Sequence, residues 1–395
     1  MKNNKTLVIG VTGGIAAYKA LDLTSKFKKA DIDVHIIMTK AATEFVAPLS
    51  FQSLSQNMVA TDMFSEPKAW EIQHISLAKK ADLMLIAPAT ADIIGKVANG
   101  IADDMLSTAI MAAKSKVVFA PAMNTNMYLN PITQHNIAKL KSYGYEFIEP
   151  ASGRLACGDQ GVGKLEDVEI IYENILAMLY PIKDMVGKQV IVTAGPTLSQ
   201  IDPVRFISNN SSGKMGYAIA LEARDRGANV TLISGPTEIK KPIGVDFVSV
   251  TTNEQMYDEI MKRYETTDLV VKAAAVADYK VKNYSDKKIK KNDEDLTIEF
   301  VKNIDILKQL GEKKTHQKLV GFAAESNDVI KYAEGKLKKK NLDYIVANDI
   351  SASDTGFGSE DNRVTIISKD GTVHNLDKMS KRDVAKNIFD IINTK

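Results

Sequence analysis

Short apolar runs alternate with longer amphipathic stretches in two parts of the chain. Residues 6–39 contain an apolar run (TLVIGV), a glycine turn, an amphipathic stretch at 15–29 and a second apolar run (VHIIMT). Residues 189–234 repeat this order, with an amphipathic stretch at 213–226 between QVIVTAGPT and NVTLISG. Strands that are apolar throughout are typical of parallel sheets covered by helices on both faces. Each part therefore predicts a β-loop-α-β unit.

Further apolar runs extend both units. In the first half, runs at 82–90 and 116–124 precede expected helices at 92–113 and after Pro131, and Tyr172–Tyr180 predicts a last helix. In the second half, further strands are expected at 269–277, 318–325, 343–349 and 363–369, the last with a hairpin turn at Lys369–Gly371. This pattern predicts an α/β protein with two doubly wound, mostly parallel, Rossmann-like domains.

The segment PIKDMVGK at 181–188 predicts a linker between the two domains. We therefore expect domains at 1–184 and 185–395. The total of 395 residues suits two domains of this size, since domains average about 150 residues.

Composition excludes several protein classes. The chain is 45% hydrophobic and 25% charged, which is ordinary for a globular protein and argues against disorder. A net charge of +2 provides no overall excess for binding nucleic acid. One cysteine cannot form an internal disulfide, and no window approaches the roughly 18 apolar residues of a membrane span. Without a signal-peptide pattern either, we expect a cytoplasmic protein with no membrane or nucleic-acid partner.

The strand ends of the first half carry small and polar residues. The turn at 10–15 lacks the G-x-G-x-x-G pattern, and Met38-Thr39-Lys40 offers no acid for a ribose, so NAD fits poorly. A helix start beside two glycines instead suits one phosphate group, although tight strand-helix packing also explains these glycines. ProAlaThrAlaAsp at 88–92 and ProAlaMetAsn at 121–124 allow a flat ligand to approach the backbone.

Two further residues of the first half have open interpretations. His74 begins an expected helix, where a lone histidine is more often structural, but the next strand ends in the 88–92 loop. Cys157 lies in a segment with four glycines among residues 152–163. A free cysteine is usually a small buried hydrophobe, whereas this segment is typical of a loop that delivers a thiol to a pocket.

The second half contains signs of a phosphorylated ligand. Residues 208–216 (SNNSSGKMG) precede a helix but miss the phosphate-loop pattern, because Ser208 and Met215 stand where that pattern requires Gly and Ser or Thr. The lysine-rich segment 280–291 follows a small-residue strand end with a carboxylate at Asp278. A solvated loop explains such lysines, but together with the carboxylate they suggest a triphosphate and a metal ion.

These motifs together resemble the bifunctional bacterial enzyme of coenzyme A biosynthesis, a phosphopantothenoylcysteine decarboxylase fused to a phosphopantothenate-cysteine ligase. The resemblance covers nearly the whole chain in the same order. The motifs that carry it are GlyGlyIleAlaAlaTyrLys (13–19), the His74 segment, ProAlaThrAlaAsp, ProAlaMetAsn, AlaCysGly with GlyValGly, AspProValArg (202–205), SerAsnAsnSerSerGlyLysMetGly, AlaAlaValAlaAspTyr (274–279) and LysIleLysLys (288–291).

For the first half, the resemblance implies a flavodoxin-like domain that decarboxylates 4'-phosphopantothenoylcysteine with FMN. It implies that His74 is an active-site histidine, that Asn124 recognises the substrate carboxylate and that Cys157 is the reducing cysteine. The flavin oxidises the thiol-bearing carbon and so provides the electron sink that loss of carbon dioxide requires. Tyr128 stands where the family often has Trp. The implied cofactor-binding residues are Gly13, Gly14, Thr39, Pro88, Ala89, Thr90, Ser107 and Thr108.

For the second half, the resemblance implies a ligase that activates 4'-phosphopantothenate with CTP and Mg²⁺ and then joins L-cysteine to the acyl-cytidylate. It implies that Asn209 acts on this intermediate and that Lys288 acts in its formation. Ile304 stands in place of a proline in the family's AsnProAspIle motif. The implied nucleotide-binding residues are Ala273, Ala274, Asp278, Lys288, Ile304, Asp305, Ile306, Leu307, Phe322, Lys336 and Lys340.

The resemblance also implies a homo-oligomer. Two alternatives remain at this point. One is a flavoprotein oxidoreductase with an unrelated nucleotide-binding domain, and the other is a regulatory flavoprotein that binds a protein partner. The presence of His74, Asn124 and Cys157 together argues against a purely regulatory role.

Overall fold

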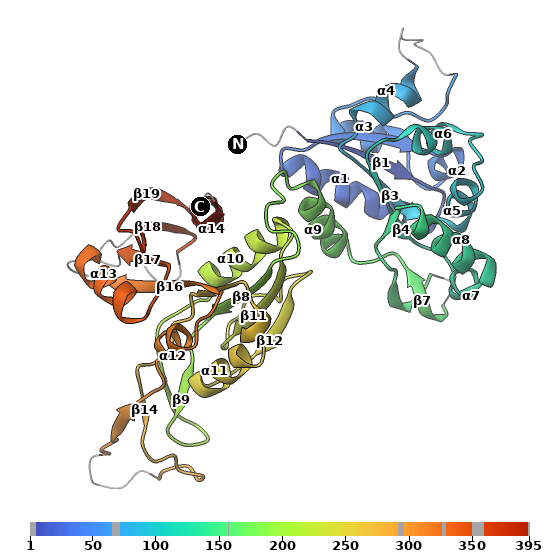
Figure 1. The fold of residues 1–395 in the computed structure, drawn as a ribbon. Coiled ribbons are helices and arrows are strands. Elements are labelled where there is room, and N and C mark those ends of the chain that lie inside the picture. Colours follow the sequence, from blue (N-terminus) through green and yellow to red (C-terminus); the bar gives the residue numbers. More distant parts are fainter. Residues whose placement is uncertain are drawn as a thin grey trace. The chain divides into compact units, whose positions relative to one another are not determined.

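The computed structural model describes residues 5–64, 72–156, 158–290, 296–325, 329–349 and 359–393. The chain forms two compact units, Met1–Leu179 and Tyr180–Lys395. Each unit is an α/β structure built on its own sheet (Figure 1). The predicted α/β class is therefore confirmed.

The first unit contains a five-stranded parallel sheet with the order β2-β1-β3-β4-β5. Its strands are β1 (Thr6–Val11), β2 (Asp33–Met38), β3 (Leu83–Ala89), β4 (Lys116–Pro121) and β5 (Glu146–Phe147). This is the flavodoxin-like order, in which the chain reverses direction across the sheet between β1 and β3. Ligands of such sheets bind outside the carboxyl ends of the strands at that point.

Helices cover both faces of this sheet because both faces of its strands are apolar. One core joins the sheet to α1 (Lys19–Lys29), α3 (Pro48–Ser55) and α9 (Val168–Leu179). The opposite core joins it to α4 (Gln73–Lys80), α5 (Ala91–Ala98), α6 (Met105–Ala112) and α8 (Pro131–Ser142). Smaller elements are the 3-10 helix η1 (Ile15–Tyr18), α2 (Lys40–Thr43), α7 (Thr125–Leu129), and the hairpin of β6 (Ala151–Arg154) and β7 (Gln160–Lys164).

The single helix predicted at 92–113 is wrong, because the structure has two helices there, α5 and α6. Gly100 follows α5 with φ of 71°, a left-handed conformation that ends a helix. Asp104 then begins α6 through a capping box with Ser107, whose amide donates to the Asp104 carboxylate at 2.8 Å. Gly100 was the signal in the sequence that the apolar stretch is divided into two helices.

The second unit contains an eight-stranded sheet with the order β12-β11-β8-β13-β16-β17-β18-β19. Its strands are β8 (Gln189–Ala194), β11 (Asn229–Ser234), β12 (Asp246–Ser249), β13 (Leu269–Lys272), β16 (Lys318–Glu325), β17 (Tyr344–Asp349), β18 (Asp361–Ser368) and β19 (Val373–Ser380). The pairs from β12 to β17 are parallel, and β18 and β19 form the predicted antiparallel hairpin at one edge.

Helices also cover both faces of the second sheet. One core holds α10 (Lys214–Asp225) and α14 (Lys381–Asn393). The other holds α11 (Asn253–Met261), α12 (Ile306–Glu312), α13 (Val329–Lys339) and the 3-10 helix η2 (Tyr264–Thr266). No helix in the described parts of the chain combines the length and apolar character that a membrane crossing requires.

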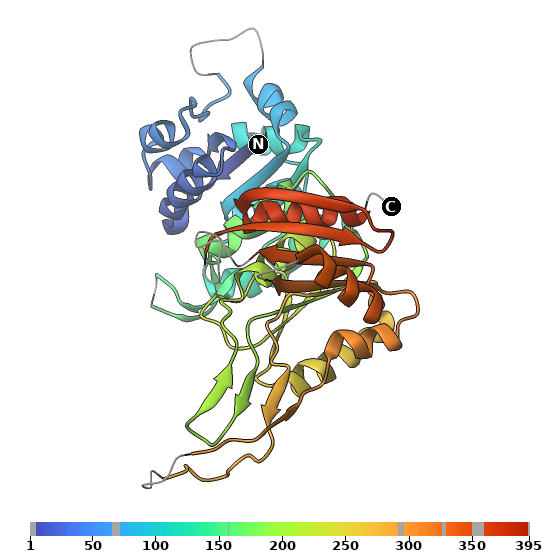
Figure 2. The same ribbon diagram turned by 90° about the vertical axis from the view of Figure 1, so that its left-hand side faces the viewer.

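Two short ribbons project from this unit, away from its sheet (Figure 1, Figure 2). One pairs β9 (Leu198–Gln200) with β10 (Phe206–Ser208), and the other pairs β14 (Tyr279–Val281) with β15 (Phe300–Lys302). We call these two ribbons, with the loops they carry, the arm. Asp202 ties the arm together, because its carboxylate accepts hydrogen bonds from the Arg205 guanidinium at 2.6 Å and from the Ile289 amide at 3.1 Å.

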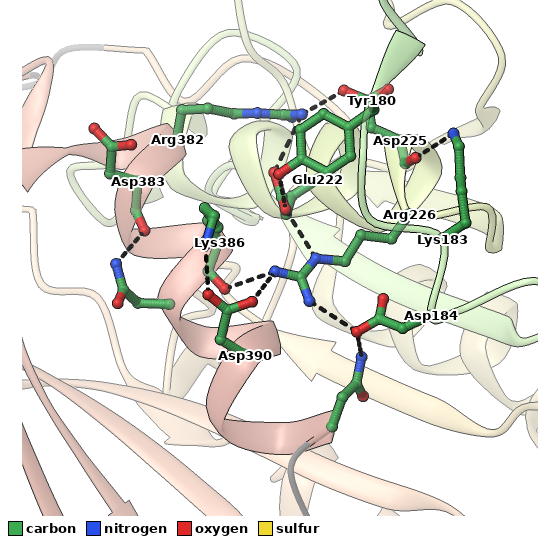
Figure 3. Close-up of polar contacts among 12 residues, drawn as sticks. Tyr180, Lys183, Asp184, Glu222, Asp225, Arg226, Arg382, Asp383, Lys386 and Asp390 are labelled. Atoms are coloured by element: carbon green, nitrogen blue, oxygen red, sulfur yellow. Dashed lines mark hydrogen bonds and ion pairs between the residues drawn. The ribbon is translucent and has the colours of Figure 1, made fainter. Parts of the chain in front are cut away.

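The segment predicted to be a linker packs on the second unit. Arg226 is completely buried, and its guanidinium donates to Glu222 at 2.9 Å and to Asp184 at 3.1 Å (Figure 3). Tyr180 donates to Glu222 at 2.6 Å, and Lys183 donates to the carbonyl oxygen of Asp225 at 2.6 Å. A buried guanidinium requires carboxylate partners, and this segment provides one of them.

Candidate functional site

The first unit has a cavity of about 490 Å³ near the carboxyl ends of β1, β3 and β4. Side chains tie the loops around it together. The Thr12 hydroxyl donates to the carbonyl oxygen of Pro88 at 2.7 Å, and the Thr90 amide donates to the Thr12 hydroxyl at 3.1 Å. We call this cavity the first pocket. Its lining includes Gly13, Gly14, Ile15, Tyr18, Lys19, Thr90, Ala122, Met123, Asn124, Met127, Arg154, Leu155, Ala156, Gly163, Lys164 and Leu165.

The two glycines of the first turn have different reasons to be glycine. A Cβ atom on Gly13 would lie 2.4 Å from the Cβ of Ala41, so only glycine allows this close packing. Gly14 has one neighbour within 4 Å of such an atom, the Thr90 methyl at 3.8 Å, and lines the pocket. A side chain there would project toward the space beside the start of η1. This cradle, small-residue lining and helix start fit a flat phosphorylated cofactor.

Asn124 lies where β4 meets the β6–β7 hairpin. Its side-chain oxygen accepts a hydrogen bond from the Asn126 amide at 2.8 Å, and its amide nitrogen donates to Asp159 at 3.2 Å. The Met123 amide donates to the carbonyl oxygen of Gly163 at 2.9 Å. Gly163 has φ of 127°, and a Cβ atom on it would lie 2.3 Å from the Met123 oxygen. This close approach holds the hairpin over Asn124.

Several residues predicted for the first site do not line this pocket. His74 is half-buried in the first turn of α4. Thr39 begins α2 by accepting from the Ala42 amide at 3.2 Å, and the Thr108 hydroxyl donates to the carbonyl oxygen of Ala102 at 3.3 Å. Cys157 lies outside the described residues, although its neighbour Ala156 lines the pocket. Pro88, Ala89 and Ser107 are buried and also do not line it.

Tyr128 stands at the position where the family often has Trp, and its hydroxyl points to the carboxylate of Glu149. Its hydroxyl donates to Glu149 at 2.6 Å. Burial, together with this hydrogen bond, raises the pKa of Tyr128 to about 12. The ring is buried in the core, while Met127 beside it faces the pocket.

The second unit has a larger cavity, of about 660 Å³, at the carboxyl ends of its parallel strands. We call it the second pocket. Every predicted nucleotide-binding residue except Lys288 lines it, and so does Asn209. These residues come from stretches at 209, 273–278, 304–307, 322 and 336–340, which the topology brings to one sheet edge.

Hydrogen bonds hold the second pocket in shape. Asn209 donates to the carbonyl oxygen of Val276 at 2.9 Å. Asp305 begins α12, and its carboxylate lies 2.9 Å from the Lys340 ammonium. Burial raises the pKa of Asp305, but Lys340 and the Lys308 amide together lower it below its ordinary value. Asp305 therefore provides a fixed negative charge beside the lysines.

Ile304 uses a backbone donor that proline lacks. Its amide donates to the Asn303 side-chain oxygen at 2.9 Å, and its carbonyl oxygen accepts from Asn253 at 2.7 Å. A proline at 304 has no amide hydrogen for the first of these bonds. The loop is thus held by a bond specific to this sequence.

The loop 208–213 reaches the second pocket at the start of α10. Gly213 begins that helix with φ of 78°, and a Cβ atom on it would lie 2.7 Å from the Thr237 methyl. The free amides of the first turn and the positive end of the helix dipole favour an anion at this position.

Lys288 is exposed in the arm and does not line the second pocket. Its neighbour Ile289 is bound to Asp202, and the Ile289 carbonyl oxygen accepts from Arg205 at 3.1 Å. The AspProValArg motif thus anchors the part of this loop that lies next to Lys288. Arg205 lowers the pKa of Asp202 far below its ordinary value, with the backbone amides contributing.

Sequence reasoning missed Lys272, which ends β13 and lines the second pocket. Its ammonium donates to the carbonyl oxygen of Ala274 at 3.0 Å. Burial, with a contribution from Lys340, lowers the pKa of Lys272 to about 8. A signal was present, because Lys272 is the one charged residue in the apolar run 269–277.

Lys381 and Asn362 also line the second pocket and were not predicted. Lys381 is the first residue of α14, and Asn362 lies on β18. No group of three or more His, Cys, Asp or Glu side chains suited to a metal ion occurs among the residues described in the structure.

Comparison with known proteins matches two separate parts of the chain. The family model described as Flavoprotein matches residues 1–180, and the one described as DNA/pantothenate metabolism flavoprotein C-terminal domain matches residues 185–395. The coenzyme A biosynthesis bifunctional protein CoaBC of Bacillus subtilis (strain 168) is 50% identical over 394 residues, covering 98% of this chain and 97% of the relative.

Two further similarities are of the same kind. The coenzyme A biosynthesis bifunctional protein CoaBC of Borreliella burgdorferi is 43% identical over 395 residues, covering 99% of this chain and 100% of the relative. The crystal structure of the C-terminal domain of a coenzyme A biosynthesis bifunctional protein CoaBC is 43% identical and has a TM-score of 0.47. That similarity covers 54% of this chain and 97% of the solved one.

Proposed function

This chain belongs to the family of bifunctional coenzyme A biosynthesis proteins, and from that premise we propose which reaction each unit performs. Residues 1–184 decarboxylate 4'-phosphopantothenoylcysteine to 4'-phosphopantetheine with FMN. Residues 185–395 join L-cysteine to 4'-phosphopantothenate with CTP, through an acyl-cytidylate. The product of the second unit is then the substrate of the first.

One observation carries this proposal: residues from separate motifs meet in one pocket in each unit. The first pocket gathers Gly13, Gly14, Thr90 and Asn124. The second pocket gathers Asn209 with residues 273–278, 304–307 and 336–340. Both pockets lie at the carboxyl edge of a parallel sheet, where such proteins bind nucleotides and flavins.

In the first unit, the flavin provides the electron sink for loss of carbon dioxide. Gly14, which has open space where a side chain would stand, allows the cofactor to approach the backbone, and Gly13 packs on Ala41 and so holds the turn in place. Asn124 recognises the substrate carboxylate with an amide oriented by Asn126 and Asp159. Cys157 delivers a proton late in the reaction, from a hairpin that closes on the pocket.

In the second unit, the substrate carboxylate becomes a mixed anhydride because a free carboxylate resists attack by an amine. Asn209 orients the anhydride, and Lys288 stabilises negative charge as the nucleotide transfers. Asp278, which lines the second pocket, is the carboxylate that would hold a Mg²⁺ ion, and the triphosphate and water would supply most of the other ligands of that ion.

We propose that the active protein is a homo-oligomer in the cytoplasm. His74 and Lys288 do not line the pockets that their proposed roles require. The arm exposes apolar side chains, among them Val204 at 58% and Tyr279 at 56%. Apolar exposure of this kind is typical of surfaces that another chain covers. The single cysteine suits the reducing compartment.

The decisive experiment incubates purified protein with 4'-phosphopantothenate, cysteine, CTP and magnesium, and follows products by mass. The expected sequence is pyrophosphate release as the acyl-cytidylate forms, then cytidine monophosphate together with 4'-phosphopantothenoylcysteine, then carbon dioxide and 4'-phosphopantetheine. Turnover of NADPH without carbon dioxide release would instead support a flavin oxidoreductase. A chelator should stop pyrophosphate release and leave decarboxylation of added 4'-phosphopantothenoylcysteine unchanged.

A further inference from the structure

The first pocket has a positively charged side that the proposed roles above leave unused. Lys19, Arg154 and Lys164 line it, and the described lining includes no carboxylate. Lys19 begins α1, Arg154 ends β6 and Lys164 ends β7. We call these three residues the basic rim.

Within the basic rim, the charges of Lys19 and Lys164 repel each other, and neither forms an ion pair with a described carboxylate. Among the described residues, no carboxylate forms an ion pair with Lys19, Arg154 or Lys164. The half-buried Lys19 ammonium has one hydrogen bond, a long one of 3.5 Å to the carbonyl oxygen of Leu165. Burial and then the charge of Lys164 lower the pKa of Lys19, and the charges of Asp167, Glu166 and Asp22 only partly offset this. An anionic ligand would relieve this repulsion.

The chemistry of the proposed substrate supplies such an anion. On the proposed function, 4'-phosphopantothenoylcysteine carries a carboxylate at the reacting end and a phosphate monoester at the other. The neutral side chain of Asn124 is assigned to the carboxylate. A phosphate monoester carries nearly two negative charges at neutral pH, and lysine and arginine are its usual protein partners.

We propose that the basic rim binds the phosphate of the decarboxylase substrate and gives this pocket its preference for a phosphorylated ligand. The inference rests on the decarboxylase function proposed above. It adds three residues to that site and assigns them one chemical group.

The β6–β7 hairpin connects the two ends of the substrate. Its register pairs Arg154 with Gln160 and Lys164 with Ala151, so two rim residues lie on this hairpin. The same hairpin reaches Asn124 through Asp159 at 3.2 Å. A substrate held by Asn124 at its carboxylate can therefore extend along the hairpin to the rim. FMN also has a phosphate, and the Gly13–Gly14 turn of the same pocket is the other candidate position for such a group, so FMN binding by the rim variants distinguishes the two phosphates.

The test measures carbon dioxide release by the full-length protein from 4'-phosphopantothenoylcysteine and from its dephosphorylated form, pantothenoylcysteine. Lys19→Met and Lys164→Met should each lower kcat/KM for the phosphorylated substrate about tenfold, mainly through KM. Both should leave kcat/KM for the dephosphorylated substrate unchanged. The double variant should remove most of the preference, and Lys19→Arg should restore it. Lys29→Met, at the exposed end of α1, is the matched control.

The possible failures are distinguishable. Equal losses on both substrates would overturn the inference and leave the decarboxylase function intact. Weaker FMN binding by the variants, measured by quenching of flavin fluorescence, with an unchanged substrate preference would assign the rim to the cofactor phosphate and also overturn it. If wild-type protein releases carbon dioxide from neither substrate, the proposed function itself fails, and the inference fails with it.

Discussion

The lysines of the second pocket differ in whether a carboxylate pairs with them. Among the described residues, the Lys272 ammonium contacts the carbonyl oxygen of Ala274 and makes no ion pair, whereas the neighbouring Lys340 is paired with Asp305. A lysine in this state lowers stability, because its charged form loses hydration without gaining a partner. It gains that partner when a polyanion binds. Lys272 is therefore best explained as a ligand-binding residue that lowers the stability of the protein until an anion binds.

Replacing Lys272 by Met should therefore stabilise the protein and weaken the nucleotide site. The folded pKa of about 8 lies below the ordinary lysine pKa of 10.5, so the unfolded chain binds more protons between these values. The destabilisation is complete below about pH 8 and fades as the pH rises toward 10.5. At pH 7, Lys272→Met should raise the melting temperature and raise the nucleotide KM about tenfold. Calorimetry and pyrophosphate release measure the two effects.

The pH dependence of nucleotide affinity tests the same role of Lys272. A triphosphate favours the protonated amine, so wild-type nucleotide affinity should fall as the pH rises through about 8. Lys272→Met should show a flatter profile over that range. If its profile matches that of wild type, Lys272 does not contact the nucleotide.

Elements differ in how closely they are held to the pockets. The β6–β7 hairpin approaches Met123 so closely that Gly163 has no room for a side chain, whereas a Cβ atom on Gly144 would meet nothing within 4 Å. Both glycines have positive φ, of 127° and 90°. Substitutions at Gly163 and Gly144 therefore distinguish the effect of a steric clash from the effect of backbone strain.

Gly163→Ala should lower decarboxylation at least tenfold and leave ligation unchanged. The added methyl group would force the hairpin away from Met123 and Asn124, whereas Gly144→Ala adds only the strain of a left-handed backbone, about 1 kcal/mol. Carbon dioxide and pyrophosphate release, measured on each variant, report the two activities. Equal effects of the two substitutions on decarboxylation would show that hairpin contact is unimportant.

The arm depends on Asp202 in a similar way. Asp202→Asn keeps the size of the side chain but removes the charge that Arg205 and the Ile289 amide bind. It should impair nucleotidyl transfer, because the loop carrying Lys288 loses its attachment. Asp286→Asn, at an exposed position of the same loop, serves as the control. Wild-type rates of acyl-cytidylate formation by Asp202→Asn in quenched flow would exclude this role.

At the scale of the whole molecule, each unit has its own cores and its own pocket. The segment after α9 is held within the second unit by the buried Arg226 and its carboxylate partners (Figure 3). Removing a fully buried charge leaves Glu222 and Asp390 with one partner fewer each. The loss of stability should therefore be confined to the second unit.

Arg226→Met should destabilise the second unit by about 3–5 kcal/mol and leave the first unit unchanged, since breaking a buried ion pair exposes the full desolvation cost of its partners. Calorimetry should show one transition moving to lower temperature. The melting of bound flavin, followed by its fluorescence, should not move. Arg263→Met is the control, because Arg263 is 34% exposed and its ion pair with Glu259 contributes at most about 1 kcal/mol. A shift of both transitions would contradict this separation.

Local pattern was sufficient for the fold class and for most elements. The apolar runs predicted most strands of both sheets, but not the short edge strands β5 and β12, and Gly213 marked the start of a helix. The polar and small residues after the strands predicted a pocket at the carboxyl edge of each sheet, because parallel strands place their carboxyl ends at one edge. The error at 92–113 came from reading an apolar periodicity through Gly100.

Tertiary structure alone decided which side chains meet. Hydrophobic periodicity determines the face of an element but carries no information on contacts between distant segments. Arg226 forms a hydrogen bond with Asp184 in the segment predicted to be a linker. Lys272 lines the second pocket, and Lys19 and Lys164 line the first pocket together. The physical reason is that burial and charge pairing depend on three-dimensional neighbours, which sequence separation does not specify. The sequence by itself determined the two sheets and their ligand edges, and the folded chain determined which charges at those edges remain for a ligand to neutralise.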